Sequence, residues 1–328
     1  MGKRMVILGA AESGVGAAVL AQKKGFDVFV SDMGKIKPHY VDMLDRYGIA
    51  WEDGGHTEEL VLNADEVIKS PGIPEDAPMV LKVKAAGIPI ISEIEFAGRY
   101  THAKMICITG SNGKTTTTSL IYHIFKKAGY NVGLAGNIGQ SLALQVAEKD
   151  YDYYVIELSS FQLDNMYRFR ANIAVLLNIT PDHLDRHKTL ENYIAIKESI
   201  TKNQDENDFC VLNYNDPVLR EFGKTPRCKV IFFSSSEELE SGVFLRGDTM
   251  IIKENGVETP VCTTKDTSLV GMHNYENIMA AIAMTHAMGV PLDTIRQGIK
   301  EFTAVEHRIE FVAEKNGVKY YNDSKGTN

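Results

Sequence analysis

The stretch that decides the fold is residues 104–118, KMICITGSNGKTTTT. An apolar run from Met105 to Ile108 predicts a strand, and the glycine turn after it leads into a helical pattern. Such a strand–turn–helix cradles phosphate, because the turn's backbone N–H groups point inward and the helix presents its positive N-terminus. Lys114 adds a full charge, and the hydroxyl that follows can reach Mg²⁺. The stretch therefore predicts a site for a nucleoside triphosphate.

The turn is shorter than the common phosphate-loop pattern. That pattern places a glycine five residues before the Gly-Lys pair, and Ile108 stands there in this chain. The alternative is a strand-to-helix turn with an incidental lysine. We disfavour it because the lysine and a run of hydroxyl residues stand together at the predicted helix start.

Length and composition narrow the classes of function. The chain has 328 residues, enough for about two domains with apolar cores. The net charge of −8 and the lack of a basic block argue against nucleic acid or an anionic membrane surface as partner. Four scattered cysteines form no CxxC pair, which fits a reducing cytoplasm. No run approaches the ~20 apolar residues of a membrane span.

The first hundred residues alternate between strand and helix patterns. We expect strands at 4–8, 26–31 and 88–91, and helices at 14–24 and 79–86. This order predicts an open, parallel, Rossmann-like α/β unit. A further helical segment, 92–100, connects it to a second α/β unit.

The second unit begins with the phosphate loop. Its expected elements are strands at 153–158 and 173–177 and helices at 115–128, 190–202 and 275–288. Two Asn-Gly pairs then predict hairpin turns, Asn255-Gly256 between strands 243–252 and 257–262, and Asn316-Gly317 between 308–314 and 318–322.

The first glycine turn, Gly9 to Gly14, allows a dinucleotide interpretation, with Asp32 ending the second strand. However, Ala11 replaces the middle glycine of GxGxxG, the residue that lets a backbone approach a pyrophosphate. NAD is therefore disfavoured against another phosphorylated ligand at this helix start.

Other candidates follow strand ends or lie on helices. Glu157 ends a buried strand, where an acidic Mg²⁺ ligand belongs, although it could merely cap a turn. His183 follows another strand end and could be structural or functional. The helical pattern gives Lys197 a solvated tip. Asn274 and Asn277 stand at a helix start, where an amide either caps the helix or pairs with a base edge.

Seven segments, taken in order, resemble the Mur ligase family, the ATP-dependent amino-acid ligases of peptidoglycan synthesis. They are TGSNGKTT (109–116), GNIG (136–139), ELSSFQL (157–163), NITPDHLDRH (178–187), GMHNYENIMAA (271–281), EHRIE (306–310) and NDSKGTN (322–328). GSNGKT and HNxxN are family-wide, whereas ELSSFQL and NDSK are similar to the D-glutamate-adding branch. Gly326 stands where the family usually has Ala.

The resemblance implies an α/β enzyme of three domains. These would be a UDP-substrate-binding domain at 1–92, a central ATP-binding domain at 93–302 and, at 303–328, the start of a C-terminal domain that is mostly missing. The activity would be addition of D-glutamate to UDP-N-acetylmuramoyl-L-alanine through an acyl phosphate. We expect the chain as it stands to fold but not to complete ligation.

The resemblance also implies roles for single residues. Gly110, Ser111, Asn112, Gly113, Lys114, Thr115 and Thr116 would hold ATP, with Asn277 on adenine and Arg308 and Asp323 on ribose and phosphates. One Mg²⁺ would lie on Thr115 and Glu157, and a second on His183 and a carbamylated Lys197. The UDP-sugar would meet Ser13, Asp32, Ser70 and Gly72. Asn137 and Ser159 would touch substrate, and Lys325 and Thr327 would lie near D-glutamate.

The implied protein is a cytoplasmic monomer that binds neither nucleic acid nor membrane. Three alternatives stay open at this point. One is another ATP-dependent amide ligase, such as a sister Mur ligase or folylpolyglutamate synthase. The others are a nucleotide-binding chain without turnover and, from a different class, an NAD-dependent oxidoreductase.

Overall fold

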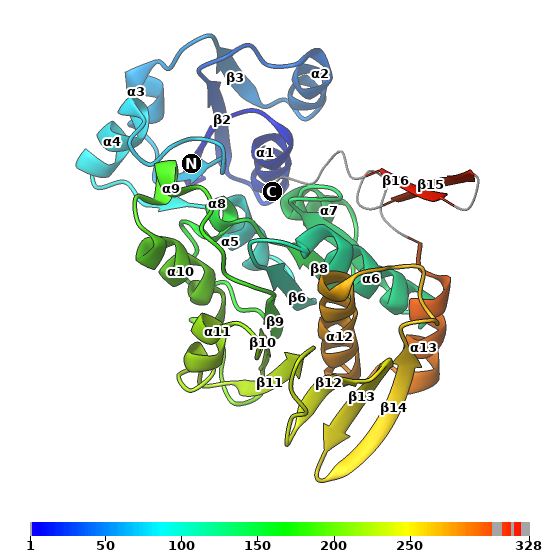
Figure 1. Ribbon diagram of the computed structural model, residues 1–328. Coiled ribbons are helices and arrows are strands. Elements are labelled where there is room, and N and C mark those ends of the chain that lie inside the picture. The colour runs from blue at the N-terminus through cyan, green and yellow to red at the C-terminus, as the bar shows by residue number, and fades with distance from the viewer. Residues whose placement is uncertain (1, 304–309, 316–317, 323–328) are drawn as a thin grey trace. The chain divides into compact units, whose positions relative to one another are not determined.

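The computed structural model describes residues 2–303, 310–315 and 318–322. The chain divides into two compact units. The first comprises Met1–Met105, Gly133–Ala171 and Asp182–Asn203, and the second comprises Ile106–Val132, Asn172–Pro181 and Gln204–Asn328. Figure 1 colours the chain by residue number, so the returns of the chain to each unit can be followed. The domain limits expected from the sequence stay a prediction.

A parallel sheet forms the core of the first unit, in the order β3-β2-β1-β4-β5. Its strands are β1 (Arg4–Leu8), β2 (Asp27–Asp32), β3 (Ala50–Asp53), β4 (Glu66–Lys69) and β5 (Ile90–Ile91). The helices between them are α1 (Glu12–Lys23), α2 (Pro38–Arg46), α3 (Glu58–Val61) and α4 (Pro78–Ala85). The open parallel α/β unit predicted from the sequence is confirmed. The sequence pattern did not identify β3, and it made β5 two residues too long.

Alternating side chains of β1 face two layers of helix. Val6 and Leu8 pack with Val80 and Val83 of α4 in one apolar cluster, and all four side chains are buried. The other face of the sheet meets α1, which is buried from Gly14 to Ala21. Because both faces are covered, the strands have continuous apolar runs instead of alternation.

The remaining elements of the first unit come from the middle of the chain. They are α5 (Glu93–Gly98), β7 (Val132–Gly136), α7 (Leu142–Glu148), β8 (Tyr153–Glu157), α8 (Ser160–Leu163), α9 (Leu184–His187), α10 (Leu190–Glu198) and the 3-10 turn η1 (Ser199–Thr201). Helices α5 and α7 both contact α1.

The helix expected at 190–202 is α-helical only to Glu198, because residues 199–201 form the 3-10 turn η1.

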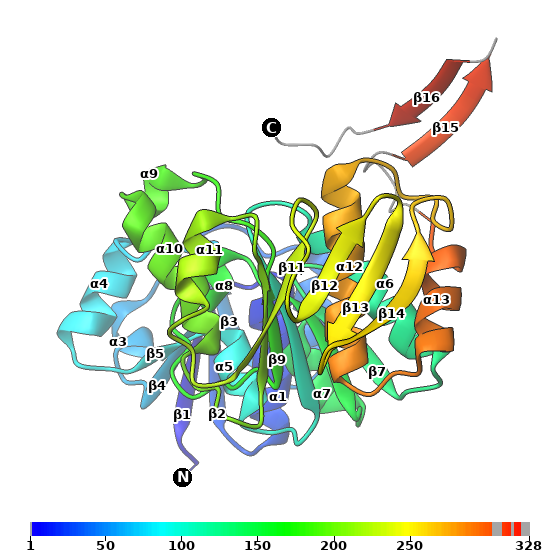
Figure 2. The same ribbon diagram turned by 60° about the horizontal axis from the view of Figure 1, so that its bottom comes forward.

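Among the described residues the second sheet has nine strands and is mixed. Its members in the second unit are β6 (Lys104–Thr109), β9 (Ile173–Leu176), β10 (Phe209–Asn213), β11 (Lys229–Ser234), β12 (Gly242–Arg246), β13 (Thr249–Glu254) and β14 (Val257–Thr263). Strands β6, β9, β10, β11 and β12 pair in parallel, whereas β12, β13 and β14 pair antiparallel. Figure 2 shows the three antiparallel strands with α12 (Met272–Ala287), and the other helices of this unit are α6 (Lys114–Lys127), α11 (Pro217–Phe222) and α13 (Leu292–Glu301).

The prediction of one long strand at 243–252 is wrong. The chain reverses at Gly247, whose φ of 61° lies in the left-handed region, so β12 and β13 form a hairpin of their own. The next hairpin turn, Asn255-Gly256, is confirmed, because both residues have positive φ (51° and 78°) between β13 and β14.

A separate two-stranded hairpin follows, β15 (Glu310–Lys315) and β16 (Val318–Asn322). It agrees with the predicted strands over the residues described. Its predicted turn, Asn316-Gly317, and its predicted start at Arg308 lie outside the described residues. In the part of the chain that is described, no helix has both the length and the apolar character needed to cross a membrane.

Candidate active site

The phosphate loop joins β6 to α6 in the second unit. Gly110 and Gly113 have φ of 146° and 84°, which only glycine adopts without strain. A Cβ on Gly110 would lie 2.9 Å from the Cβ of Leu177, and one on Gly113 would lie 2.2 Å from Oδ1 of Asn277. Both positions therefore require glycine for two reasons, the backbone conformation and the lack of space for a Cβ.

Asn178 and Thr180, which follow β9, hold this loop in place. Asn112 N donates to Oδ1 of Asn178 (2.8 Å), whose Nδ2 donates back to the carbonyl of Asn112 (3.1 Å). Ser111 Oγ donates to the carbonyl of Thr180 (2.9 Å) and accepts from its N–H (2.9 Å). These mutual bonds preorganise the turn, and they identify Asn178 and Thr180 as loop supports that sequence reasoning missed.

Lys114 folds back over its own loop. Its Nζ donates to the carbonyls of Gly110 (3.0 Å) and Ser111 (2.7 Å). The ammonium is thus held at the mouth of the turn and is half-buried there. Thr115 is half-buried and Thr116 is buried at the start of α6. The arrangement provides a cation and helix N–H groups for an anionic ligand.

Asn277 lies on α12 and is 4% exposed. Its Nδ2 donates to Oδ1 of Asn274 (3.3 Å), and Asn274 donates to the carbonyl of Val270 (2.8 Å). The N-cap of α12 is Gly271, so the capping alternative for these asparagines is wrong. Asn277 is the one that touches the phosphate loop.

In the first unit, Glu157 ends β8 with a side chain that is 1% exposed. One oxygen, Oε1, accepts from Nδ2 of Asn137 (2.8 Å). The other, Oε2, is buried and has no hydrogen-bond partner among the described residues. The backbone N–H of Asn137 also donates to the carbonyl of Glu157 (2.9 Å). A buried carboxylate oxygen without a donor is suited to a hard cation such as Mg²⁺.

Ser159 and Ser160 follow directly. Ser159 forms a capping box with Gln162 at the start of α8. Ser160 Oγ is hydrogen-bonded to Nε2 of His187 (2.9 Å). The segment ELSSFQL is therefore held near the end of β8 by its own capping box and by the bond to His187.

His183 and Lys197 are brought into one aromatic neighbourhood of the first unit. His183 has a φ of 49°, a half-exposed ring, and Phe161 at 4.9 Å between ring centroids. Lys197 is 1% exposed and its Nζ lies 4.9 Å from the centre of the Tyr193 ring. The predicted solvated tip of Lys197 is wrong, because helix α10 turns this side chain inward. Burial lowers the pKa of His187, and the nearby charges of Arg186, His183 and Lys197 lower it further.

The described residues contain no group of three His, Cys, Asp or Glu side chains that could hold a metal.

Arg186 is a residue that sequence reasoning missed, although it stands in the segment DHLDRH beside His183. Its guanidinium lies 4.2 Å from the centre of the Phe161 ring. It donates to the carbonyls of Pro71 (3.0 Å) and Ile73 (3.3 Å) and lies 3.6 Å from a carboxylate oxygen of Asp164. Arg186 thereby connects the turn after β4 to the His183 segment.

The expected UDP-sugar residues lie at the carboxyl ends of β1, β2 and β4. Asp32 accepts from the N–H of Ala10 (2.6 Å) and of Gly34 (2.8 Å). Ser70 Oγ donates to the carbonyl of Gly9 (3.2 Å), beside the turn that contains the half-buried Ser13. Gly72 is exposed, with open space where a Cβ would lie.

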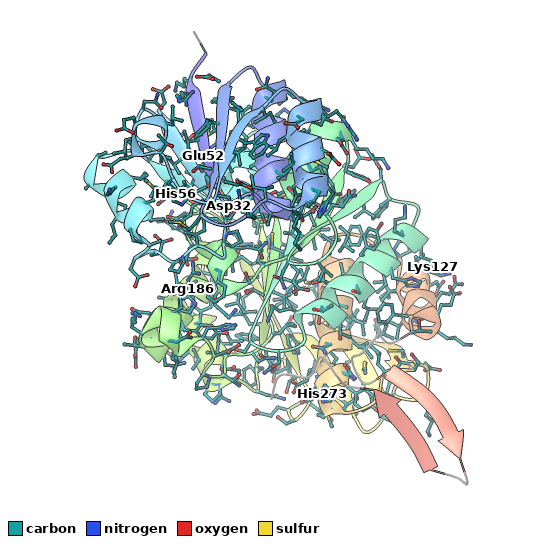
Figure 3. All side chains as sticks on the ribbon, turned by 90° about the horizontal axis from the view of Figure 1, so that it is seen from above. Asp32, Glu52, His56, Lys127, Arg186 and His273 are labelled. Atoms are coloured by element: carbon teal, nitrogen blue, oxygen red, sulfur yellow. The ribbon has the colours of Figure 1, made fainter. Side chains whose placement is uncertain are left out.

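A further polar cluster adjoins Asp32, as the labels of Figure 3 show. Ser31 Oγ donates to Oε1 of Glu52 (2.7 Å) and lies 2.6 Å from Nδ1 of His56. Glu52 also accepts from the N–H and hydroxyl of Thr57 (2.8 and 2.6 Å). Burial lowers the pKa of His56, against the opposing charges of Glu52 and Asp32. The sequence pattern did not reveal this cluster because β3 was not identified.

The turn after β4 is anchored by an ion pair between the buried Lys69 and the half-buried Glu75. Lys69 is 2% exposed and its Nζ lies 3.0 Å from Oε1 of Glu75. Burial alone would raise the pKa of Glu75, but the hydrogen bond from Lys84 and the charge of Lys69 bring it down to about 2.

Four expected site residues, Arg308, Asp323, Lys325 and Thr327, lie outside the described residues.

Two protein families match this chain, one in its N-terminal part and one in its central part. The family of the Mur ligase middle domain matches residues 108–285, and that of the MurD N-terminal domain matches residues 5–79. A UDP-N-acetylmuramoylalanine–D-glutamate ligase from Bacteroides thetaiotaomicron is 57% identical over 330 residues, 99% of this chain and 74% of that protein. The chain belongs to the UDP-N-acetylmuramoylalanine–D-glutamate ligases. The resemblance to the Mur ligase family and to its D-glutamate-adding branch is confirmed.

A second relative and a solved structure extend the comparison. The protein of the same name from Porphyromonas gingivalis is 50% identical over 328 residues, 99% of this chain and 73% of that protein. Among solved structures, a UDP-N-acetylmuramate:L-alanyl-gamma-D-glutamyl-meso-diaminopimelate ligase from Neisseria meningitides has a TM-score of 0.67 at 22% identity. That match covers 93% of this chain and 100% of the other, and it supports the Mur ligase fold alone.

Proposed function

We propose that the chain takes part in ATP-dependent addition of D-glutamate to UDP-N-acetylmuramoyl-L-alanine. The observation that carries the proposal is the pairing of a preorganised phosphate loop with membership of this ligase family. The sister ligases and folylpolyglutamate synthase are less well supported, because the 57% identical relative has the D-glutamate activity in its name.

The chemistry takes two steps. The terminal carboxylate of UDP-N-acetylmuramoyl-L-alanine attacks the γ-phosphorus of ATP, and ADP leaves, which gives an acyl phosphate. The amine of D-glutamate then attacks the acyl carbon, and inorganic phosphate leaves as the amide forms. Because several anions meet, the protein mainly has to position them and offset their repulsion.

The phosphate loop would bind the triphosphate. Lys114, whose Nζ donates to the carbonyls of Gly110 and Ser111, would pair with the β- and γ-phosphates. Asn277 lies against Gly113 and would contact adenine. The hydroxyls of Thr115 and Thr116 stand at the helix start.

Mg²⁺ fits the residues present, because Oε2 of Glu157 is buried and no described residue donates to it. Thr115 and Glu157 would hold one ion, and His183 with a carbamylated Lys197 a second. When bound, these ions would offset phosphate charge and polarise the γ-phosphoryl oxygens. Asn137 would orient Glu157 through its hydrogen bond to Oε1.

The carbamate would form between Nζ of Lys197 and CO₂, with loss of a proton. The burial of Lys197 supports the proposal, because it holds Nζ inside the unit beside Tyr193 and not in solvent. The test is the Mg²⁺ affinity of Lys197→Ala with and without short-chain carboxylic acids. We expect Mg²⁺ binding to weaken and to be partly restored by the acid; unchanged Mg²⁺ affinity without acid would exclude a carbamate ligand.

The UDP part of the substrate would lie at the turn of Gly9 to Gly14, with Ser13, Asp32, Ser70 and Gly72 around it. Ser159 would lie near the amino-acid end, and Arg308, Asp323, Lys325 and Thr327 are proposed from resemblance alone. The domains are proposed as 1–92, 93–302 and 303–328, in a monomeric, cytoplasmic protein.

The decisive experiment combines binding with turnover. Calorimetry compares UDP-N-acetylmuramoyl-L-alanine, ATP and NAD, and ADP release is measured with D-glutamate, L-alanine or L-lysine as acceptor. The Bacteroides thetaiotaomicron relative is assayed beside this chain, because the match covers 74% of its length. We expect the UDP-substrate to bind more tightly than NAD, and ADP release in the relative to require D-glutamate. Tighter binding of NAD would overturn the assignment.

A further inference from the structure

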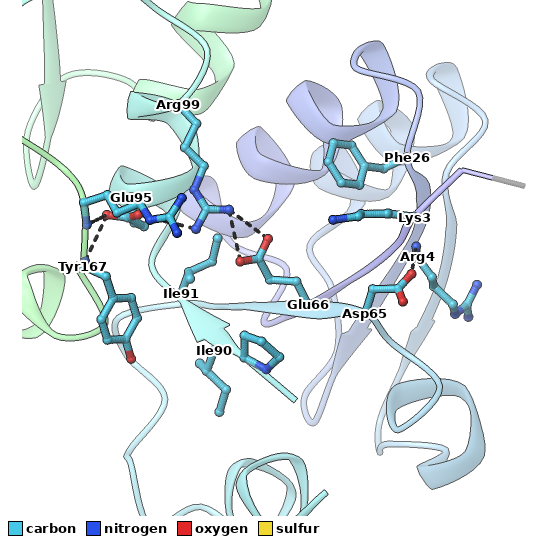
Figure 4. Close-up of a pocket in the computed structure, with 12 residues that line it drawn as sticks. Lys3, Arg4, Phe26, Asp65, Glu66, Ile90, Ile91, Glu95, Arg99 and Tyr167 are labelled. Carbon is cyan, nitrogen blue, oxygen red and sulfur yellow. Dashed lines mark hydrogen bonds and ion pairs between the residues drawn. The ribbon is translucent and has the colours of Figure 1, made fainter. Parts of the chain in front are cut away.

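A cavity of about 590 Å³ lies in the first unit at the amino ends of β1, β4 and β5. It is lined by residues at the start of each strand, among them Arg4, Glu66 and Ile90 (Figure 4). Asp32 and Ser70 lie at the opposite, carboxyl edge of the same sheet. The cavity is therefore separate from the proposed UDP-sugar site, and no role described so far uses it.

One part of the cavity is apolar. Ile90 and Ile91 contribute buried aliphatic surface (6% and 2% exposed). Phe26 also lines it, supported by Phe96 in an edge-to-face contact at 5.8 Å. Tyr167 lines it as well and keeps half of its surface exposed, so its ring is accessible from solvent. These groups suit the flat apolar body of a small molecule.

The acidic groups of the lining already accept hydrogen bonds. Glu66 accepts two hydrogen bonds from Arg99 (3.0 and 2.9 Å). Glu95 accepts from three successive backbone N–H groups, those of residues 167–169 (2.8–3.0 Å), and lies 3.4 Å from Arg99. Asp65 accepts from the N–H of Arg4 (2.7 Å). Arg99 therefore offsets the charge of two of the three carboxylates.

Two cations of the lining, Lys3 and Arg168, are not neutralised. Both residues are exposed, and within the described part of the chain no group accepts a hydrogen bond from either side chain. The backbone of Arg168 is nevertheless anchored, because its N–H donates to the buried Glu95 (2.9 Å). The cavity thus has an apolar wall, satisfied acids and two free positive charges.

We propose that this cavity binds a small organic anion built on an aromatic ring. The ring packs against Ile90, Ile91 and Tyr167, and the anionic group pairs with Lys3 and Arg168. The volume falls within the range of about 300–1,000 Å³ that small-molecule sites occupy. The proposal rests on the lining of the cavity and does not depend on the ligase assignment.

The test uses 2-naphthoate as probe and the neutral 2-naphthamide as its match in shape. Ligand-observed NMR titration of the intact chain gives both dissociation constants. We expect 2-naphthoate to bind about tenfold more tightly, because only the carboxylate can pair with the two cations. Equal affinities, or no binding of 2-naphthoate up to millimolar concentration, would overturn the proposal.

Variants locate the binding. Arg168→Glu should weaken 2-naphthoate about tenfold, whereas Arg227→Glu, an exposed arginine of the second unit, should leave it unchanged. Tyr167→Ala should weaken both probes, and circular dichroism checks that each variant is folded. Saturating ATP should not compete. Loss of binding in Arg227→Glu, or competition by ATP, would place the anion elsewhere and contradict the site.

Discussion

The turns that follow β1 and β6 share a strand–glycine–helix topology but differ in charge. In the first, Asp32 accepts the N–H of Ala10, and Glu12 stands in the first turn of α1. In the second, Lys114 lies over the loop and the neutral amide of Asn178 holds it. The same backbone design is therefore lined by acids in one unit and by a cation in the other.

The difference teaches that backbone geometry alone does not select the ligand. Gly9 and Gly110 both have positive φ (91° and 146°), and both turns open onto a helix N-terminus. The side chains beside them decide what can bind. We infer that the second turn takes the triphosphate, whereas the first offers Asp32 as an acceptor for a donor group such as a nucleobase amide.

The largest expected effect comes from removing the cation of the second turn. Lys114→Ala should weaken ATP binding by a factor on the order of ten to a thousand, because no other full charge lies within the loop. The measurement is calorimetry of the chain with ATP and Mg²⁺. Lys127→Ala, at the far end of α6 and paired with Glu301 (2.7 Å), is the matched control. Equal ATP affinity in both variants would contradict the phosphate-loop assignment.

The next largest effect is on stability, and it separates backbone strain from close packing at Gly113. The comparison residue is Gly129, which follows α6 and has a similar φ. Gly129→Ala should cost about 1 kcal/mol in the free energy of unfolding, because its φ is 79° and nothing lies within 4 Å of a new Cβ. Gly113→Ala has a similar φ of 84° but also meets Asn277 at 2.2 Å, so about 3 kcal/mol is expected. Denaturant titration measures both, and equal costs would show that Asn277 moves aside freely.

The stability of the chain should depend on pH through Glu93, a buried acid close enough to Glu12 of the first turn to feel its charge. Burial raises the pKa of Glu93 to about 7, although hydrogen bonds from Ala143 N (2.6 Å) and Ser141 Oγ (2.8 Å) oppose the shift and the charge of Glu12 adds to it. Below its unfolded pKa the side chain is protonated in both states. As pH rises towards 7 the unfolded chain loses the proton first, so the native state is destabilised.

We therefore expect the free energy of unfolding to fall by about 2 kcal/mol between pH 5 and pH 7 relative to Glu93→Gln. Denaturant titrations at both pH values measure it. Glu59→Gln, on an exposed part of α3, is the control and should keep the pH dependence of the unmodified chain. The same pH dependence in Glu93→Gln as in the control would show that Glu93 does not titrate in this range.

The smallest effect concerns the acid of the first turn itself. Asp32→Asn leaves one oxygen to accept from both Ala10 and Gly34, so one N–H loses its partner at a cost of about 1 kcal/mol. Binding of UDP should weaken about tenfold, while ATP binding at the second turn should not change. Calorimetry with both nucleotides checks this, and an equal loss for both would mean that the two turns are not independent.

Some turns were predictable from the sequence, whereas contacts between distant segments were not. Asn255-Gly256 and the glycines of the phosphate loop were predictable, because a turn depends on the conformations its own residues allow. Glu95 shows the opposite case. In the sequence it is one charge in a predicted connecting helix, whereas in the fold it is buried and accepts three backbone N–H groups from residues 167–169.

The sequence by itself determined the α/β class, the phosphate loop and the ligase family, since each is recorded in short, contiguous segments. Only the tertiary structure decided that Lys197 is buried, that one oxygen of Glu157 has no donor within the described ranges and that Arg186 donates to Pro71. Only it revealed the cavity at the amino ends of β1, β4 and β5. The physical reason is that burial and unsatisfied hydrogen bonds depend on which distant segments pack together, and no local pattern of residues records that.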